Sequence, residues 1–464
     1  MFHRFFRAAS AVLLSASLAL SLLIPVSAEE PEVDPFVPDV ELRSQAAVLT
    51  NLDDGEILFS HNGDKQLYPA SLVKIMTCLL AVESGVDFST PVTAPDYVFD
   101  ELYGLGASTA DIRHGEVVEF GDLIYATMLP SACEAASIIA HHLSDGNIPA
   151  FVQQMNDKAA ELGATNTHFT NAHGLHDPDQ YTTAEDMTRI LLYALKNEQF
   201  TTVVTTQNYT MKATNKHAEP RTYQHTNYMM SKGLGGQKYY YPYVQGIKTG
   251  TTDEAGRNLA SMATKDGYRY LLVTLGAPSY DEEKEEYIVD NGAFLDAIDL
   301  YDWAFNNLRY RTVYTTGDIL ESVSVKYAWD VDTVNLSPSS NITILLPQSL
   351  KTEDLKLKSK LPGEPIKATV EKGQEIGSGT LSYGDRTLAA FTLVAEQRVE
   401  RSVVVAVSDN LFGIITSWQF LLIFGIIVAL LVFYIWVTIR YNRRRRRRRA
   451  IEARYRNNPN RPKQ

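Results

Sequence analysis

A serine and a lysine three residues apart, Ser71 and Lys74, open an apolar stretch of the chain. The apolar residues recur at helical spacing, and three-residue spacing places the two side chains on one face of a helix. A serine hydroxyl needs a base to become a nucleophile, and a partly buried lysine can lose its charge and act as that base. The pair therefore indicates covalent catalysis by serine, although a helix-capping serine beside an exposed lysine gives the same pattern.

Two later segments carry polar groups that fit the same chemistry. Residues 131–133 (Ser-Ala-Cys) stand between a Leu-Pro pair and an alanine-rich helical run. Residues 248–252 (Lys-Thr-Gly-Thr-Thr) continue an apolar, strand-like segment, and their cation and hydroxyls suit a carboxylate. The glycine lets another backbone approach closely, and the edge of such a strand can pair with an extended peptide. Each segment alone is explained as well by a helix cap or by a strand ending in a turn.

The order Ser-x-x-Lys, Ser-x-x, Lys-Thr-Gly is typical of penicillin-binding proteins and β-lactamases. The chain resembles one family of this group, the D-alanyl-D-alanine carboxypeptidases among the low-molecular-mass penicillin-binding proteins. The resemblance extends around the motifs, to residues 68–77, 169–175 (Phe-Thr-Asn-Ala-His-Gly-Leu), 181–187 and 246–252. It covers roughly residues 40–310, and the region after them resembles the family's C-terminal domain less specifically.

The resemblance implies a fold and a role for each motif residue. The fold is the α/β (α+β) penicillin-binding/β-lactamase-like transpeptidase fold with a helical subdomain. Ser71 attacks the carbonyl between the two terminal D-alanines of a peptidoglycan stem peptide, Lys74 is the general base, and Ser131 relays a proton to the leaving amine. The implied substrate-binding residues are Lys248 and Thr249 at the terminal carboxylate, with Gly250, Thr251 and Cys133 beside the substrate. The backbone N–H groups of Ser71 and Thr251 form the oxyanion hole, and water hydrolyses the acyl-enzyme without a metal or cofactor.

Two positions depart from the family's pattern. Cys133 stands where the family has an asparagine, and a thiol is a weaker hydrogen-bond donor and acceptor than a carboxamide. Cys133 as the nucleophile is the rival interpretation, but no base is placed for it. Ala293 aligns with an arginine that helps to hold the terminal carboxylate. Either another basic residue substitutes for that arginine, or the preferred substrate differs.

The cysteines and two histidines suggest secondary hypotheses. Cys78 lies seven residues after Ser71 and hence on the same helix face, near Cys133. We expect two separate buried thiols, with a disulfide as the alternative. His173 and His176 are three residues apart without a third ligand in sight, so they are interpreted as structural.

The elements that position these residues follow from hydrophobic patterning. Two strand-like segments around an Asp-Gly pair, within residues 47–59, predict a β-hairpin. The apolar stretch after Ser71 predicts a helix, residues 268–276 a buried strand, and residues 294–305 another helix. This order predicts a sheet covered by helices, in a domain that we place at residues 29–312.

The following region has a different pattern. Short apolar or alternating segments at residues 323–325, 342–344 and 388–395 are separated by Gly, Pro, Asp and Ser. They predict a small all-β domain at residues 313–405, between the larger domain and an apolar segment.

Both ends of the chain indicate export. Residues 1–28 have a basic start, an apolar run and a small-residue cleavage pattern, which predict a cleaved signal peptide rather than a retained anchor. Residues 411–439 carry no charged side chain, and seven arginines follow at residues 443–449. They predict one transmembrane helix in the cell membrane, with residues 440–464 as a cytoplasmic tail and the catalytic domain outside the cytoplasm.

The net charge of −12 hides an uneven distribution. Residues 440–464 hold 12 of the 43 Lys and Arg, and the part between signal and tail has 29 basic and 54 acidic residues, a net charge of −25. Such a surface argues against binding to nucleic acid or other polyanions. With only two cysteines, the fold is not a disulfide scaffold.

The expected function is that of a serine-type D-Ala-D-Ala carboxypeptidase at the membrane, with β-lactams as covalent inhibitors. A DD-endopeptidase and a β-lactamase of the same fold are the enzymatic alternatives. The membrane anchor and the β-rich domain weigh against the β-lactamase. A weakly catalytic penicillin-binding sensor or scaffold is the third alternative, supported only by Cys133 and Ala293.

Overall fold

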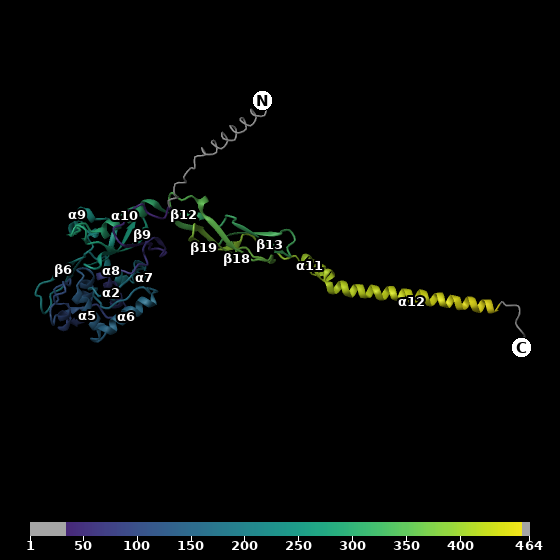
Figure 1. Cartoon of the computed structure of the whole chain (residues 1–464), viewed down its shortest axis with the longest axis horizontal. Helices are drawn as coiled ribbons and strands as arrows, with labels where there is room; N and C mark the ends of the chain where they lie inside the picture. The colour runs from purple at the N-terminus through teal and green to yellow at the C-terminus, as the bar shows by residue number, and fades with distance from the viewer. Residues whose placement is uncertain (1–33, 457–464) are drawn as a thin grey trace, which may run out of the picture. The chain divides into compact units, whose positions relative to one another are not determined.

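The computed structural model describes residues 34–456, so the predicted signal peptide lies outside the described residues. The chain divides into two compact units, one that ends at Leu308 and one that begins at Arg309. Figure 1 labels helices and strands in both.

A five-stranded antiparallel sheet forms the centre of the first unit, in the order β2-β1-β9-β8-β7. The predicted hairpin is confirmed, because β1 and β2 pair antiparallel with Val48 opposite Ser60. The three later strands return beside β1, which makes β7 the last strand on its side of the sheet. The strands are β1 (Ala46–Asn51), β2 (Ile57–His61), β7 (Val244–Thr252), β8 (Gly256–Lys265) and β9 (Tyr268–Ala277).

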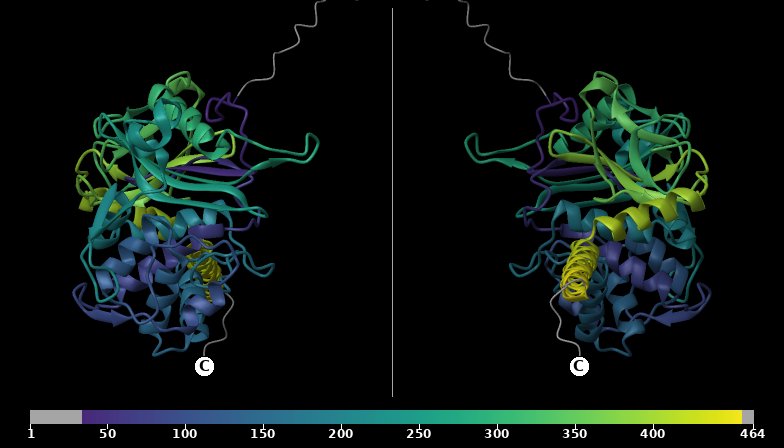
Figure 2. Two further views of the ribbon diagram at one scale, coloured as in Figure 1. Left: turned by 90° about the vertical axis from the view of Figure 1, so that its left-hand side faces the viewer. Right: turned by 90° about the vertical axis from the view of Figure 1, so that its right-hand side faces the viewer.

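Helices cover both faces of this sheet. Successive residues of a strand point to opposite faces, so each strand contributes side chains to the packing on both sides. Val48 and Val273 join the large helical core on one face, and Tyr270 contacts Phe305 of α10 on the other. Figure 2 shows the purple and blue helices of that core gathered on one side of the sheet. The helices are α2 (Val73–Glu83), α3 (Tyr97–Leu102), α4 (Phe120–Met128), α5 (Cys133–Leu143), α6 (Ile148–Glu161), α7 (Ala184–Ala194), α8 (Glu198–Thr205), α9 (Lys232–Tyr239) and α10 (Gly292–Asn307).

Helix α2 is the central helix of this core. Its apolar side chains are buried around most of its circumference, as expected for a helix surrounded by others. A short 3-10 turn, η2 (Ala70–Leu72), precedes it and packs against β7 and β8. The start of this buried helix is thereby held at the edge of the sheet.

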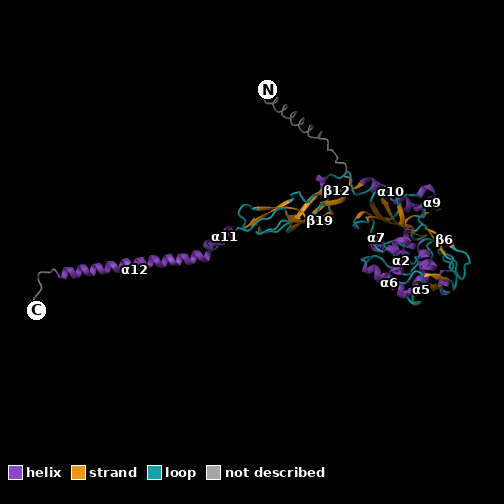
Figure 3. Ribbon diagram, turned by 180° about the vertical axis from the view of Figure 1, so that it is seen from behind, coloured by secondary structure: helices purple, strands orange, loops and turns teal. Residues whose placement is uncertain are grey.

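The second unit is β-rich, as predicted, and ends in two helices. A six-stranded sheet has the order β16-β18-β19-β14-β13-β17, and β12 pairs with β15. Figure 3 shows these strands in orange. Val334, Leu336 and Leu393 form the centre of its small core. The strands are β12 (Leu308–Tyr314), β13 (Glu321–Lys326), β14 (Thr333–Pro338), β15 (Ile342–Pro347), β16 (Lys356–Lys360), β17 (Ile366–Lys367), β18 (Glu375–Tyr383) and β19 (Arg386–Ala395).

Helices α11 (Val403–Thr416) and α12 (Trp418–Arg456) complete the second unit. By length and composition, α12 is the one helix among residues 34–456 that could cross a membrane. The most apolar stretch of α12 is not buried against the rest of the protein.

Candidate active site

Ser71 stands in the turn η2, directly before α2. The preceding residue, Ala70, has φ +47°, a left-handed conformation that residues with a side chain rarely adopt. Helix α2 begins at Val73, so Lys74 lies in its first turn. The Nζ atom of Lys74 lies 3.0 Å from the Oγ atom of Ser71. The predicted contact between the two side chains is therefore present.

Lys74 is fully buried, and its amine has two further polar neighbours. The amine lies 3.5 Å from the Sγ atom of Cys133 and donates to the carbonyl oxygen of His173. Burial lowers the pKa of Lys74, because desolvation disfavours the ammonium form, while Cys133 and Glu134 act in the opposite direction. A buried amine with a lowered pKa, in contact with a hydroxyl, can act as a general base.

The loop that carries His173 packs on the nucleophile turn. Asn171 Oδ1 accepts a hydrogen bond of 2.6 Å from the N–H of Gly174 and so closes the loop. Gly174 has φ +79°, and a Cβ atom there would overlap the carbonyl group of Ala70. Burial and the neighbouring Lys74 lower the pKa of His173 to about 3, so its ring is neutral. Sequence reasoning missed the contact with Lys74, because a backbone carbonyl makes it.

Ser131 and Cys133 lie where α5 begins. Ser131 has φ +65° and is 5% exposed, and its hydroxyl has no hydrogen-bond partner within the described part of the chain. Buried polar groups are nearly always paired, so this hydroxyl is free to bond to a bound molecule. The backbone N–H of Cys133 donates to Ser108 at 2.8 Å, which ties the start of α5 to the neighbouring loop.

The two cysteines are both free and buried. They are the two separate thiols that we expected, and the alternative disulfide is wrong. Burial raises the pKa of the Cys78 thiol, which keeps it protonated. Cys133 is the thiol that reaches Lys74.

The third motif forms the end of β7. Lys248 is fully buried, and its Nζ atom donates to the carbonyl of Thr249 at 2.8 Å. Burial lowers the pKa of Lys248 well below its usual value, and the nearby charge of Lys74 lowers it further. Thr249 Oγ1 donates to Thr226 Oγ1 at 2.6 Å, so that hydroxyl is engaged within the protein.

Gly250 and Asn258 fasten this sheet edge to the nucleophile turn. A Cβ atom at Gly250 would lie 3.0 Å from the carbonyl oxygen of Pro69 and 3.1 Å from the nitrogen of Ser71, so glycine allows the predicted close approach. Asn258 Nδ2 donates to the carbonyls of Tyr68 at 2.9 Å and Pro69 at 3.0 Å. Sequence reasoning gave Asn258 no role, because its partners, which include the N–H of Gly276, are backbone groups at distant positions in the sequence.

A cavity of ≈420 Å³ opens beside Ser71 and brings the three motifs together. Cys133 from α5 and Thr251 from β7 line it together with Ser71. Because β7 is the last strand of its sheet, an extended peptide can pair with its outer edge. Within residues 34–456, no three His, Cys, Asp or Glu side chains gather in a way that could hold a metal ion.

The position expected for a second basic residue is occupied by Ala293, which is buried at the start of α10. Arg257 brings a guanidinium group to this region from β8, where it pairs in register with Thr251. Its side chain donates to the carbonyls of Ile288 and Asp290, just before α10. Arg257 therefore contacts the segment just before α10, and Arg43, which pairs with Asp296 at 3.0 Å, is a second basic residue at the start of that helix.

The sheet edge, the serine–lysine pair and the lysine-bearing strand define a serine peptidase of the penicillin-binding type. Comparison with known families agrees with this class. The family described as D-alanyl-D-alanine carboxypeptidase matches residues 29–279, and the C-terminal domain of penicillin-binding protein 5 matches residues 309–401. The chain belongs to the D-alanyl-D-alanine carboxypeptidase family and is a serine peptidase.

Individual relatives match over most of both chains. The D-alanyl-D-alanine carboxypeptidase DacA of Haemophilus influenzae is 28% identical over 89% of this chain and 97% of its own length. DacF of Bacillus subtilis is 27% identical over 81% of this chain and 91% of its own length. Among solved structures, penicillin binding protein 5 from Haemophilus influenzae is similar with a TM-score of 0.57 and 27% identity, over 79% of this chain and 100% of that one. The Streptomyces K15 DD-transpeptidase has a TM-score of 0.51 and 27% identity, over 58% and 100%.

Proposed function

We propose that this protein removes the terminal D-alanine from peptidoglycan stem peptides through an acyl-enzyme on Ser71. The observation that supports this proposal most directly is the fully buried amine of Lys74, which lies 3.0 Å from the Ser71 hydroxyl and has a lowered pKa. The substrate follows from the family and from the relatives' names as D-alanyl-D-alanine carboxypeptidases.

The reaction proceeds in two steps. In the first, Lys74 accepts the proton of Ser71 while Oγ bonds to the carbonyl carbon of the penultimate D-alanine. The C–N bond then breaks, and Ser131 passes a proton, replaced from Lys74, to the leaving amine. In the second step, water attacks the ester, releases the shortened peptide and returns a proton to Ser71.

The other motif residues hold the substrate. The backbone N–H groups of Ser71 and Thr251 receive the oxyanion, a role that the close packing of Gly250 on the nucleophile turn supports. Lys248 and Thr249 receive the terminal carboxylate. Lys248 forms no ion pair within the described residues, so an arriving carboxylate would favour its charged form.

Cys133 takes the place of the family's asparagine beside Lys74 and the substrate. Solved variants of the Streptomyces K15 DD-transpeptidase include a serine changed to alanine and a cysteine two residues later changed to asparagine. Ser131 and Cys133 have the same spacing, which supports the alignment of the second motif.

The proposed setting is the outer face of the cell membrane. Residues 1–28 are the signal peptide, residues 29–312 the peptidase domain and residues 313–405 a β-rich spacer. Residues 411–439, within α11 and α12, contain the single span, and residues 440–464 lie in the cytoplasm. The length and apolar surface of α12 support the span, and the adjoining arginines support its direction. β-Lactams would acylate Ser71 in place of the stem peptide.

The test measures two reactions of the full chain in detergent. D-alanine release from a pentapeptide ending in D-Ala-D-Ala and labelling by a fluorescent penicillin should both be present. Ser71→Ala should abolish both, whereas Ser322→Ala, at an exposed serine of β13, should preserve both.

The alternatives predict different results. Penicillin labelling without D-alanine release would replace the carboxypeptidase by a sensor or scaffold. Rapid penicillin turnover would indicate a β-lactamase. Preferential cleavage of cross-linked stem dimers would indicate a DD-endopeptidase.

A further inference from the structure

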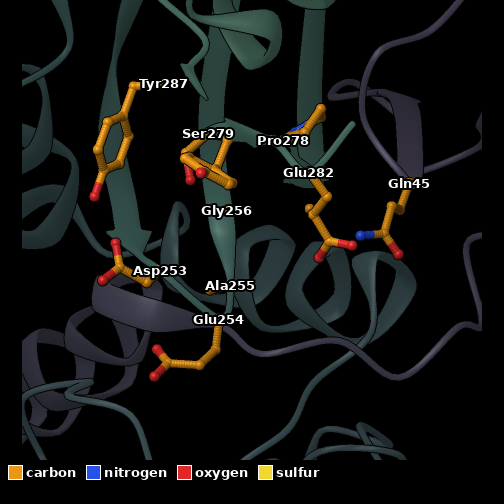
Figure 4. Close-up of a pocket in the computed structure, with 11 residues that line it drawn as sticks. Gln45, Asp253, Glu254, Ala255, Gly256, Pro278, Ser279, Glu282 and Tyr287 are labelled. Carbon is orange, nitrogen blue, oxygen red and sulfur yellow. The ribbon is translucent and has the colours of Figure 1, made fainter. Parts of the chain in front are cut away.

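Two acidic side chains, Asp253 and Glu254, lie in the turn between β7 and β8 and line the cavity that contains Ser71. They also line an adjoining cavity of ≈410 Å³, shown in Figure 4. In that view both carboxylates are directed to the same side, away from Glu282 and Gln45. The nucleophile's cavity therefore has one acidic end.

These two carboxylates have no Lys or Arg partner in the described part of the chain. The nearest basic group is His176, whose Nδ1 atom lies 3.9 Å from Glu254 Oε2. Carboxylates without a counter-ion at the wall of a cleft attract cationic ligands and repel anionic ones.

The direction of β7 determines which part of a peptide meets the acidic end. In the proposed function, the terminal carboxylate lies at Lys248 and Thr249, and the scissile carbonyl lies at Ser71 and Thr251. The preceding residue of the substrate must therefore extend beyond Thr251, toward the 253–254 turn. At about 3.3 Å per extended residue, that turn is within reach of a long side chain.

We infer that Asp253 and Glu254 select stem peptides whose third residue, directly before D-Ala-D-Ala, carries a free primary amine. This inference rests on the proposed function. In peptidoglycan that amine is free in an uncross-linked stem and acylated in an acceptor stem of a cross-link. The acidic end thus favours uncross-linked stems.

The experiment compares two peptides on the full chain in detergent. Nα-acetyl-Lys-D-Ala-D-Ala has a free side-chain amine, and Nα,Nε-diacetyl-Lys-D-Ala-D-Ala has none. The ratio of their kcat/KM values for D-alanine release should exceed one by about three- to tenfold at low salt and decrease as salt is added. The double variant Asp253→Asn/Glu254→Gln should bring the ratio below about twofold.

The control variant, Glu282→Gln/Glu283→Gln, removes the same charge from the neighbouring acidic segment, and Glu282 does not line the cavity of Ser71. It should keep the wild-type ratio. A second readout, competition of each peptide against labelling by fluorescent penicillin, requires no turnover.

The possible outcomes separate the two proposals. Equal kcat/KM values for the two peptides in the wild type would overturn the inference and leave the carboxypeptidase in place. A loss of preference in the control variant would also overturn it, because the effect would then be one of overall charge. Stronger competition by the free amine without any D-alanine release would support the inference and overturn the proposed activity.

Discussion

Two buried amines, Lys74 and Lys248, dominate the electrostatics of the site. Neither forms an ion pair within residues 34–456, and the charge of Lys74 lowers the pKa of Lys248 further. A charged amine buried without a carboxylate loses hydration that the protein does not replace, so the neutral form is favoured. The hydrogen bond to the carbonyl of His173 positions the amine of Lys74 without fixing its charge.

The rate of acylation should therefore depend on pH in one direction. The base form of Lys74 is neutral, so acylation of Ser71 by fluorescent penicillin should decrease as pH falls through the lowered pKa of Lys74. Lys74→Arg, which stays protonated, should decrease the rate by about 10²–10⁴-fold at every pH.

The control is Lys212→Arg at an exposed lysine. It should leave both the rate and its pH profile unchanged. An acylation rate that stays constant in the wild type from acidic pH up to about pH 10 would contradict the role of Lys74 as base.

Residue types and spacing revealed the side chains that react but not those that hold them. Ser71 and Lys74 were predictable, because three-residue spacing on a helix fixes their distance within one local element. The contacts of His173 and Asn258 were not predictable. His173 contacts Lys74 through its own backbone carbonyl, and Asn258 donates to two backbone carbonyls. Backbone groups are the same at every residue and leave no signature in the sequence.

At the scale of elements, strand β7 and the 171–175 loop meet the turn η2 at the start of α2, although the three segments are far apart in sequence. Strand β7 packs under η2 through Gly250, and the 171–175 loop packs on it through Gly174. Both glycines admit another backbone where a side chain would collide. The position of Ser71 therefore depends on both segments as well as on its own helix.

Gly174→Ala should disturb that position. The added methyl would overlap the carbonyl of Ala70, so we expect acylation by penicillin to decrease at least tenfold, together with a loss of stability. Gly163→Ala is the matched control, because Gly163 also has a positive φ, of +76°, but has open space around it. The control should lose only the ~1–2 kcal/mol of a strained backbone.

Unfolding and acylation are measured for both variants. Equal acylation rates for the two would show that the 171–175 loop does not position the nucleophile.

The local elements were predicted well, and their arrangement was not. The hairpin of β1 and β2, the strand β9 and the helix α10 follow from patterns within about ten residues, and all three predictions are confirmed. The pairing of β1 with β9 joins segments more than 200 residues apart. No periodicity encodes such a partner, so only the resemblance to a family indicated the complete sheet.

At the scale of the whole molecule, charge and apolar surface are separated along the chain. Residues 29–439 are strongly acidic, whereas residues 440–464 are basic. The apolar surface of α12 is uncovered by protein. Burying such a surface in lipid is strongly favourable, which is why we place the span there.

Removal of residues 411–464 should therefore convert a membrane protein into a soluble one. The full chain should stay in the membrane fraction at high salt and alkaline pH, and the truncated chain should not. Replacing the arginines of residues 443–449 by glutamine retains the span and should keep the chain in the membrane. Release of that variant by salt alone would indicate surface attachment by charge in place of a span.

The continuity of α12 has a mechanical consequence. Its 39 residues amount to about 58 Å of rod, nearly twice the ~30 Å thickness of the hydrocarbon layer. With the apolar part immersed as we propose, the arginine-bearing turns would project beyond the lipid as a stiff extension of the same rod. Seven consecutive arginines at about 100° per residue point in every direction around its axis. Whatever the tilt of the rod, some of these guanidinium groups must therefore face away from the headgroups and into water.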